Sequence, residues 1–280
     1  MESAPAPIAS FSCSDKDSRA LLELVATSGR RQRVRPRGAR RHSGALRVLG
    51  ALRVPGALML ALSACGGPHA PVAATDPCAG LDAGTGGLYD LNCEFSFTQN
   101  PHGAWSYGSS SSLAPDQFRL ATVTDTGNPV GLWHPDARTY YPYVAWNDSA
   151  FARADGTNSW AVEPRQVAME AAPGGRFSVV RFVAPQAGRY SVNAVFQGIH
   201  FRNSTTDVHV VLGDTGLFAA DIDGYGGNPA FHARQGPSPV AGFARVLDLA
   251  AGEALSFAVG NGKDGANSND TTGLTVHIER

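Results

Sequence analysis

Apolar and polar residues alternate along the second half of the chain, and this alternation constrains the fold more than any other feature. Tyr190, Val192, Ala194 and Phe196 are apolar and point one way, whereas Ser191 and Asn193 between them are polar and point the other way. The same pattern recurs at Val208–Leu212, Leu255–Val259 and Leu274–Ile278. Side chains of a strand point alternately to opposite faces, so each segment predicts a half-buried strand. Because clusters of Gly, Pro, Asn and Asp separate these segments, the sequence predicts an all-β fold, either an antiparallel sandwich or a barrel.

Shorter strand patterns extend this prediction toward the N-terminus. They lie at Phe118–Thr124, Val130–Trp133, Tyr143–Trp146, Gln166–Glu170 and Phe177–Ala184. No linker-like segment interrupts residues 88–280, so we expect this stretch to form a single β-sandwich domain. About 200 residues are enough to enclose a proper hydrophobic core.

The N-terminal part of the chain has a different character. An apolar run from Val54 to Ala64 follows Arg47 and Arg53, and it is too short to span a bilayer core of about 30 Å. The run closes with Leu-Ser-Ala-Cys at residues 62–65, which resembles the lipobox of bacterial lipoproteins. The resemblance implies cleavage before Cys65 and a diacylglycerol on its thiol, which would anchor the protein to a membrane of the cell envelope. The alternative is a buried apolar helix with a chance cysteine.

This motif divides the chain into a leader at residues 1–64, a tether rich in Gly, Pro and Ala at residues 65–87, and the domain. The leader exceeds the usual length of about 15–30 residues, so we expect translation to start downstream of Met1, at Val34 or Val48. Eleven of the 23 Lys and Arg residues but four of the 24 Asp and Glu residues lie in the leader, which leaves the remainder at a net charge of −8. An acidic domain lacks the basic patch that phosphate recognition requires, so we expect no nucleic-acid partner.

Of the four cysteines, Cys13 lies in the expected leader and Cys65 is the expected lipid site, which leaves Cys78 and Cys93. Outside the cytoplasm two such cysteines usually pair, and we expect a disulfide that closes the loop between them. A metal site is the alternative, although no histidine lies within the loop and the chain has no CxxC motif.

The stretch Tyr89–Gly108 combines a short strand pattern with the turn Asn-Pro-His-Gly-Ala-Trp-Ser-Tyr-Gly at residues 100–108. Together with Val179–Gly198, Leu247–Gly262 and Asn269–Ile278, it resembles a β-sandwich module that recurs in exported bacterial proteins. The resemblance covers about residues 88–280. It implies a jelly-roll-like sandwich that is similar to carbohydrate-binding domains.

Aromatic residues crowd into the first half of the expected domain. The candidate ligand-binding rings are Trp105, Tyr107, Trp133, Tyr140, Tyr141, Tyr143, Trp146 and Trp160. Flat rings with a polar handle stack on the apolar faces of sugars at a small cost in conformational entropy. We expect Trp133 and the Tyr140–Tyr143 run to be exposed, because they lie in turn-rich sequence. The alternative is that most of these rings pack in the core.

The loop before the last expected strand is rich in oxygen ligands. Asp264, Asn267, Asn269 and Asp270 lie close together there, and such a set suits Ca²⁺, which accepts irregular geometry. These four residues are therefore a candidate structural calcium site. Asn and Asp also favour turns for reasons unrelated to metals, and Asp270 alternatively caps a turn at Thr272.

Signatures of common hydrolases are missing from the sequence, which contains neither GxSxG nor HExxH. We therefore expect binding rather than catalysis, with carbohydrate as the preferred ligand class. A structural or protein-interaction module of the cell surface is the alternative. A third hypothesis is a polysaccharide hydrolase that brings two carboxylates together across the sandwich.

Overall fold

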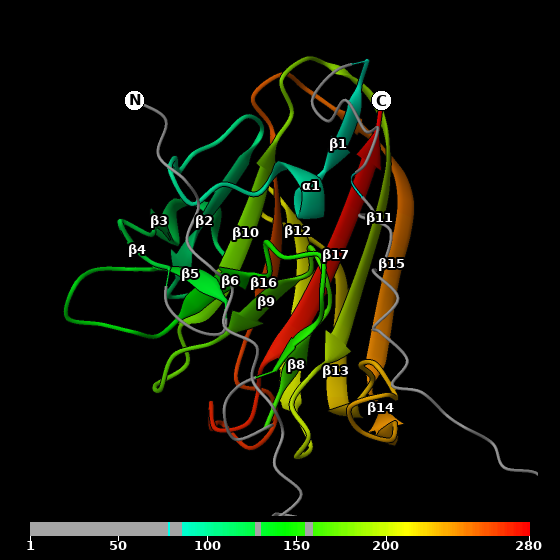
Figure 1. Cartoon of the computed structure of the whole chain (residues 1–280). Helices are drawn as coiled ribbons and strands as arrows, with labels where there is room; N and C mark the ends of the chain where they lie inside the picture. Colours follow the sequence, from blue (N-terminus) through cyan, green and yellow to red (C-terminus); the bar gives the residue numbers. More distant parts are fainter. Residues whose placement is uncertain (1–77, 79–85, 127–129, 155–158) are drawn as a thin grey trace, which may run out of the picture. The chain divides into compact units, whose positions relative to one another are not determined.

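Two antiparallel sheets face each other as a β-sandwich in the computed structural model, which describes residues 78, 86–126, 130–154 and 159–280 (Figure 1). The first sheet has eight strands, in the order β15 (Val240–Leu249), β11 (Gly188–Gly198), β17 (Thr272–Glu279), β9 (Val167–Glu170), β6 (Tyr143–Trp146), β5 (Gly131–His134) and β4 (Val123–Asp125), with β1 (Leu88–Asp90) also paired to β17. The second has seven, in the order β14 (Gln235–Ser238), β13 (Thr215–Tyr225), β12 (Thr205–Leu212), β16 (Ala254–Val259), β10 (Phe177–Val183), β2 (Trp105–Ser110) and β3 (Phe118–Leu120). The all-β prediction is confirmed.

Four short elements accompany the two sheets in the part of the chain that the structure describes. Strands β7 (Arg153–Ala154) and β8 (Ala161–Val162) form a separate two-stranded sheet, α1 (Leu91–Glu94) follows β1, and a 3₁₀ turn, η1 (Pro115–Gln117), precedes β3. From β9 onward the chain passes repeatedly from one sheet to the other, so the connectivity is jelly-roll-like. Within the described residues, no helix is both long and apolar enough to cross a membrane.

The apolar residues of the predicted alternation form the inward faces of the long strands. Tyr190, Val192, Ala194 and Phe196 of β11 are all buried between the sheets, and β16 and β17 bury their alternate residues in the same way. One prediction was wrong in detail, because Phe118–Thr124 is not a single strand. Its first part pairs with β2 in the second sheet and its last part with β5 in the first, so the chain changes sheets near Ala121.

A second hydrophobic cluster lies on the outer face of the first sheet. It comprises Val130, Leu132, Tyr143, Ala145, Val162, Ala168 and Ile199. Residues of β5, β6 and β9 form it together with β8 and Ile199, and Tyr141 and Trp160 pack against it. The first sheet is therefore covered on both faces at this point, which creates a dry environment outside the main core.

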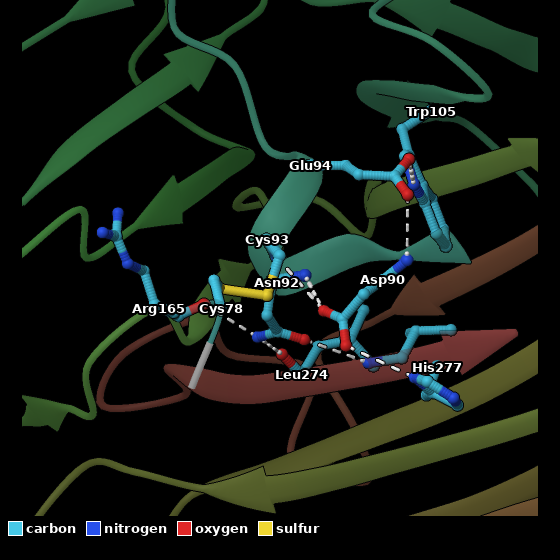
Figure 2. Close-up of polar contacts among 10 residues, drawn as sticks. Cys78, Asp90, Asn92, Cys93, Glu94, Trp105, Arg165, Leu274 and His277 are labelled. Carbon is cyan, nitrogen blue, oxygen red and sulfur yellow. Dashed lines mark hydrogen bonds and ion pairs between the residues drawn. A yellow bond between two sulfur atoms is a disulfide. The ribbon is translucent and has the colours of Figure 1, made fainter. Parts of the chain in front are cut away.

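The helix α1 is tied to β17 by one side chain, Asn92 (Figure 2). Its Oδ1 accepts from the Val276 N–H at 3.2 Å, and its Nδ2 donates to the carbonyls of Leu274 at 3.3 Å and Arg165 at 2.9 Å. These contacts lie between the part of β17 that pairs with β9 and the part that pairs with β1. The Asn92 amide thus takes the place of a neighbouring strand across the gap, which satisfies backbone groups that would otherwise be buried without partners.

The predicted disulfide is confirmed. Cys93 of α1 bonds to Cys78, with a Cα–Cα distance of 5.4 Å (Figure 2). The bond fixes residue 78, which precedes the domain, to α1, the helix whose Asn92 side chain contacts β17. The expected leader, Cys65 and the tether at residues 65–87 lie outside the described residues, apart from Cys78, Gly86 and Gly87.

The turn at residues 100–108 has a structural role. The Asn100 side chain donates to the carbonyls of Tyr107 at 2.8 Å and Ala121 at 2.9 Å, and accepts from the Tyr107 N–H at 2.9 Å. The turn therefore joins the first residues of β2 to the point where the chain changes sheets, and it places Trp105 and Tyr107 in the core.

Candidate functional site

Five of the eight candidate rings are buried: Trp105, Tyr107, Trp133 and Trp146 in the core between the sheets, and Tyr143 in the outer cluster. Trp105 and Tyr107 have no exposed surface, and Trp133 and Trp146 are buried as well. The expectation of exposure was therefore wrong for Trp133 and for Tyr143, and none of the four rings between the sheets offers a free face to a ligand. The physical reason is that each ring lies on the inward face of β2, β5 or β6, in the cluster between the sheets.

Three indole N–H groups among these rings hold the segment that follows β1. The Nε1 atom of Trp133 donates to the Ser96 carbonyl at 2.7 Å, and that of Trp146 donates to the Asn92 carbonyl at 3.0 Å. The Trp105 Nε1 donates to the Glu94 side chain at 2.9 Å (Figure 2). Buried indoles need such partners, so the tryptophans explain how this irregular segment is fixed to the sandwich.

The other four rings meet in one pocket, which we call the tyrosine pocket. Its volume is about 460 Å³, and its aromatic lining consists of Tyr140, Tyr141, Tyr143 and Trp160. Its polar lining consists of Ser159, Glu170, His200, Asn267, Ser268, Asn269 and Thr271. Residues from five separate parts of the chain therefore converge here, and the volume lies in the range of small-molecule pockets.

The innermost part of the pocket is formed by Tyr143 and Glu170, the facing terminal residues of β6 and β9. They are opposite each other in the antiparallel register, so their side chains lie on the same outer face of the first sheet. The Tyr143 hydroxyl donates to Glu170 Oε2 at 2.7 Å, and the Thr271 hydroxyl donates to the same oxygen at 2.8 Å. Glu170 is only 6% exposed, which makes it a recessed carboxyl at the inner end of the pocket.

The tyrosine rings form a cluster above this carboxyl. Tyr140 contacts Tyr141 edge to face at a centroid distance of 5.1 Å, and it contacts Tyr143 in the same way at 5.6 Å. Tyr141 and Tyr143 are also 5.6 Å apart, with tilted rings. Tyr140 remains 48% exposed, so its ring is available at the pocket mouth.

The opposite side of the pocket comes from two segments that run side by side. Trp160 and His200 form a β-bridge, and the Phe201 N–H donates to the Ser159 carbonyl at 2.6 Å. The Nδ1 atom of His200 accepts from the Arg202 N–H at 3.1 Å, which fixes the ring. Trp160 is partly buried against the outer cluster and partly open to the pocket.

Burial is the main cause that raises the pKa of the Glu170 carboxyl to about 7. The negative charge of Asp270 adds to this rise, whereas the hydrogen bonds from Tyr143 and Thr271 oppose it. Burial also raises the pKa of Tyr141 to about 12 and that of Tyr143 well above the ordinary value. Near neutral pH the phenols are therefore neutral hydrogen-bond donors, while Glu170 is divided between its acid and carboxylate forms.

The four candidate calcium ligands point to two different places. Asn267 and Asn269 line the tyrosine pocket, and Asn269 has a positive φ of 70°. Asp264 and Asp270 both contact Thr205, whose hydroxyl lies 2.8 Å from Asp264 Oδ2 and 3.3 Å from Asp270 Oδ1. Within the described ranges, no group of three His, Cys, Asp or Glu side chains is placed to hold a metal ion. Calcium binding stays a prediction.

A second cavity, of about 350 Å³, lies beside α1 and is lined by Asp90, Asn92, Glu163 and Arg165 among others. The polar side chains there maintain the fold. Asp90 caps α1 through the N–H groups of Asn92 at 2.9 Å and Cys93 at 3.2 Å (Figure 2). The Arg165 guanidinium lies 5.3 Å from the Trp146 ring centroid. We therefore take the tyrosine pocket as the candidate site.

The sequence patterns single out neither Glu170 nor His200, and they also miss Ser159, Ser268 and Thr271 of the pocket lining. The available signal was the position of Glu170, a carboxylate at the end of an otherwise apolar strand pattern, which predicts either a partner or a perturbed pKa.

No known protein family matches the sequence, and no curated protein matches it. The chain is similar to the solved C-terminal CBM6 of LamC, a marine laminarinase from Zobellia galactanivorans, with 11% identity over 41% of this chain and 80% of that one and a TM-score of 0.23. It is also similar to the carbohydrate-binding module CBM6cm-2 of Cellvibrio mixtus lichenase 5A in complex with cellotriose, at 12% identity over 41% and 77% of the two chains and a TM-score of 0.24. A family 35 carbohydrate-binding module from Clostridium thermocellum matches at 11% identity over 40% and 76%, with a TM-score of 0.25. These likenesses are low, so the fold described above rests on the strand pairing alone.

Proposed function

We propose that this protein is a lipid-anchored carbohydrate-binding module of the cell envelope and that the tyrosine pocket holds the sugar. The single observation that carries the proposal is the composition of this pocket. Exposed or partly exposed rings of Tyr140, Tyr141 and Trp160 stand beside a recessed carboxyl and the amides of Asn267 and Asn269.

A sugar presents an apolar face of C–H groups and a rim of hydroxyls, and the pocket matches both. The ring of Tyr140 at the mouth supplies a flat surface for stacking, with little conformational entropy to lose. The amides of Asn267 and Asn269 can both donate and accept, which suits hydroxyl groups that do the same. The fixed His200 ring adds a further polar edge.

Binding rather than turnover is the better proposal for this pocket. Glycoside hydrolysis commonly requires a pair of carboxylates about 5–9.5 Å apart on either side of the scissile bond. Among the described residues that line the pocket, Glu170 is the one carboxylate. Polysaccharide turnover that is lost in Glu170→Gln would establish a hydrolase instead.

The binding test compares two pocket variants with an exposed aromatic elsewhere. Tyr140→Ala and Trp160→Ala should each raise the Kd of a glycan identified on an array about tenfold or more, because each removes a stacking surface. Phe151 is 49% exposed, almost the same as Tyr140 at 48%, and it does not line the pocket. Phe151→Ala should therefore leave the Kd unchanged.

Two results would contradict the glycan proposal. If Phe151→Ala weakens binding as much as the pocket variants do, the pocket is not the binding site. If no glycan binds but an envelope protein is captured, the chain is a protein-interaction module of the cell surface.

The envelope location rests on Leu-Ser-Ala-Cys at residues 62–65. A lipid on Cys65 would hold the domain at a membrane through the Gly, Pro and Ala segment that follows. Cys65→Ser should release the protein from the membrane fraction and abolish labelling by a radioactive fatty acid. Labelling that persists in Cys65→Ser would refute the anchor.

A further inference from the structure

The tyrosine pocket contains an acidic group but no permanent cation. No Lys or Arg is among the described residues that line it. The groups that face Glu170 from the neighbouring elements are Tyr140, Tyr141, Tyr143, Asp270, Thr271 and, across the pocket, His200. Asp270 is the charged group whose field acts on Glu170, and it is also an acid: it is negative when ionised, and burial raises its own pKa to about 6.

The aromatic cluster adds to this preference for positive charge. The face of an aromatic ring carries partial negative charge and attracts a cation within about 6 Å of its centroid. Tyr140, Tyr141 and Tyr143 lie within 5.6 Å of one another, and Tyr143 also donates to Glu170. A cation that reaches the carboxyl therefore lies beside the Tyr143 hydroxyl, in a pocket whose aromatic lining includes these three rings.

A neutral ligand and a cationic ligand affect Glu170 in opposite ways. A neutral sugar would exclude water from the carboxylate without supplying a counter-charge, which makes its ionised form still less favourable. An ammonium group would supply the counter-charge and a charge-assisted hydrogen bond. Tyr143 and Thr271 both donate to Oε2, so Oε1 takes neither of these bonds.

We propose, on the basis of the carbohydrate-binding function above, that the sugar in the tyrosine pocket carries a free amine. Its ammonium group pairs with Glu170 among the tyrosine rings. The hydroxyls of the same sugar contact the amides of Asn267 and Asn269, which is why an amino sugar fits this pocket better than an isolated ammonium ion.

The test compares two oligosaccharides that differ at one group. Isothermal titration calorimetry on the protein uses a β-1,4-linked glucosamine tetramer and its fully N-acetylated counterpart. We expect the amine form to bind at least tenfold more tightly at pH 7. A carboxyl with a pKa of about 7 is half ionised at pH 7 and about one tenth ionised at pH 6, whereas the sugar amine becomes more fully protonated over the same range. The amine form should therefore bind more weakly at pH 6, by at most about fivefold.

Proton release provides a readout that needs no variant. At pH 6, titrations in two buffers of different ionisation enthalpy should show release of close to one proton per amino sugar bound, because Glu170 gives up its proton to form the pair. Glu170→Gln should abolish both the proton release and the preference for the amine. Phe151→Ala should retain both, and the thermal unfolding of each variant checks that it folds.

The outcomes separate this inference from the function on which it rests. If the acetylated sugar binds equally well or better, without proton release, the amine proposal is overturned and carbohydrate binding stands. If neither sugar nor any arrayed glycan binds, both proposals fall. If a lysine-containing peptide binds with proton release and no sugar does, the pocket recognises an ammonium on a protein, and both sugar proposals are wrong.

Discussion

Glu170 should make the folded protein less stable as the pH rises, and Glu170→Gln should remove this dependence. The carboxyl is 6% exposed, and its pKa of about 7 in the folded protein lies above the ordinary value of 4.5. The folded state therefore holds this proton more tightly than the unfolded chain does. The resulting stabilisation is complete below pH 4.5 and is lost as the pH rises through 7.

The size of the effect follows from the two pKa values. The difference between 4.5 and about 7 corresponds to a stabilisation of about 3 kcal/mol, most of which is lost between pH 5 and pH 8. The amide of Glu170→Gln can still accept from the Tyr143 and Thr271 hydroxyls, so the variant removes the titration and keeps both hydrogen bonds. Because Asp270 contributes to the raised pKa, part of the effect depends on its charge.

Urea unfolding at pH 5 and pH 8 measures this effect. The parent protein should lose about 2 to 3 kcal/mol of unfolding free energy from pH 5 to pH 8 through Glu170, and Glu170→Gln should not show this loss. Glu279→Gln, which changes an exposed carboxyl on β17, is the matched control and should follow the parent at both pH values. A Glu170→Gln difference that is the same at pH 5 and pH 8 to within about 0.5 kcal/mol would refute the argument that burial raises this pKa.

Three further predictions concern stability, and urea unfolding at constant pH measures each of them. Replacing both Cys78 and Cys93 by serine should lower the unfolding free energy by about 3 kcal/mol, because the bond joins positions 15 residues apart; no loss would mean that the unfolded chain is already constrained there. Asn92→Ala should cost more than about 2 kcal/mol, since it leaves buried backbone groups of β17 unpaired, and a loss below about 1 kcal/mol would show that water replaces the amide. Trp133→Ala should cost about 3–5 kcal/mol as a core substitution, whereas Tyr140→Ala should cost less than about 1 kcal/mol, so equal losses would contradict their different burial.

The long strands were predictable because both of their faces leave a signal in the sequence. In β11 and β17 the inward residues are large and apolar, while outward positions such as Asn193 and Thr275 are polar and exposed. The pattern also located β6 at Tyr143–Trp146. It failed at Phe118–Thr124, because alternation says which face a residue occupies but not which sheet its strand joins.

The burial of the aromatic rings was harder to predict. In β2 all six residues are buried, so Ser106 between Trp105 and Tyr107 does not mark an exposed face. Trp133 lies in turn-rich sequence, yet its strand is covered on both sides by the main core and the outer cluster. Exposure in such short strands depends on which distant segments cover them, and local composition does not report this.

The tyrosine pocket shows the same limitation at the level of function. Glu170 and Thr271 are 101 residues apart in sequence, and Trp160 reaches the pocket because its segment pairs with His200, just after the end of β11. Once these segments cover the outer face of β6 and β9, a carboxyl there loses water and its pKa rises. The covering that packs the outer cluster is therefore also the cause of the unusual chemistry of Glu170. A substitution that loosens this cover at a residue that does not itself line the pocket, such as Ile199, should affect ligand binding through the ionisation of Glu170 rather than through any direct contact.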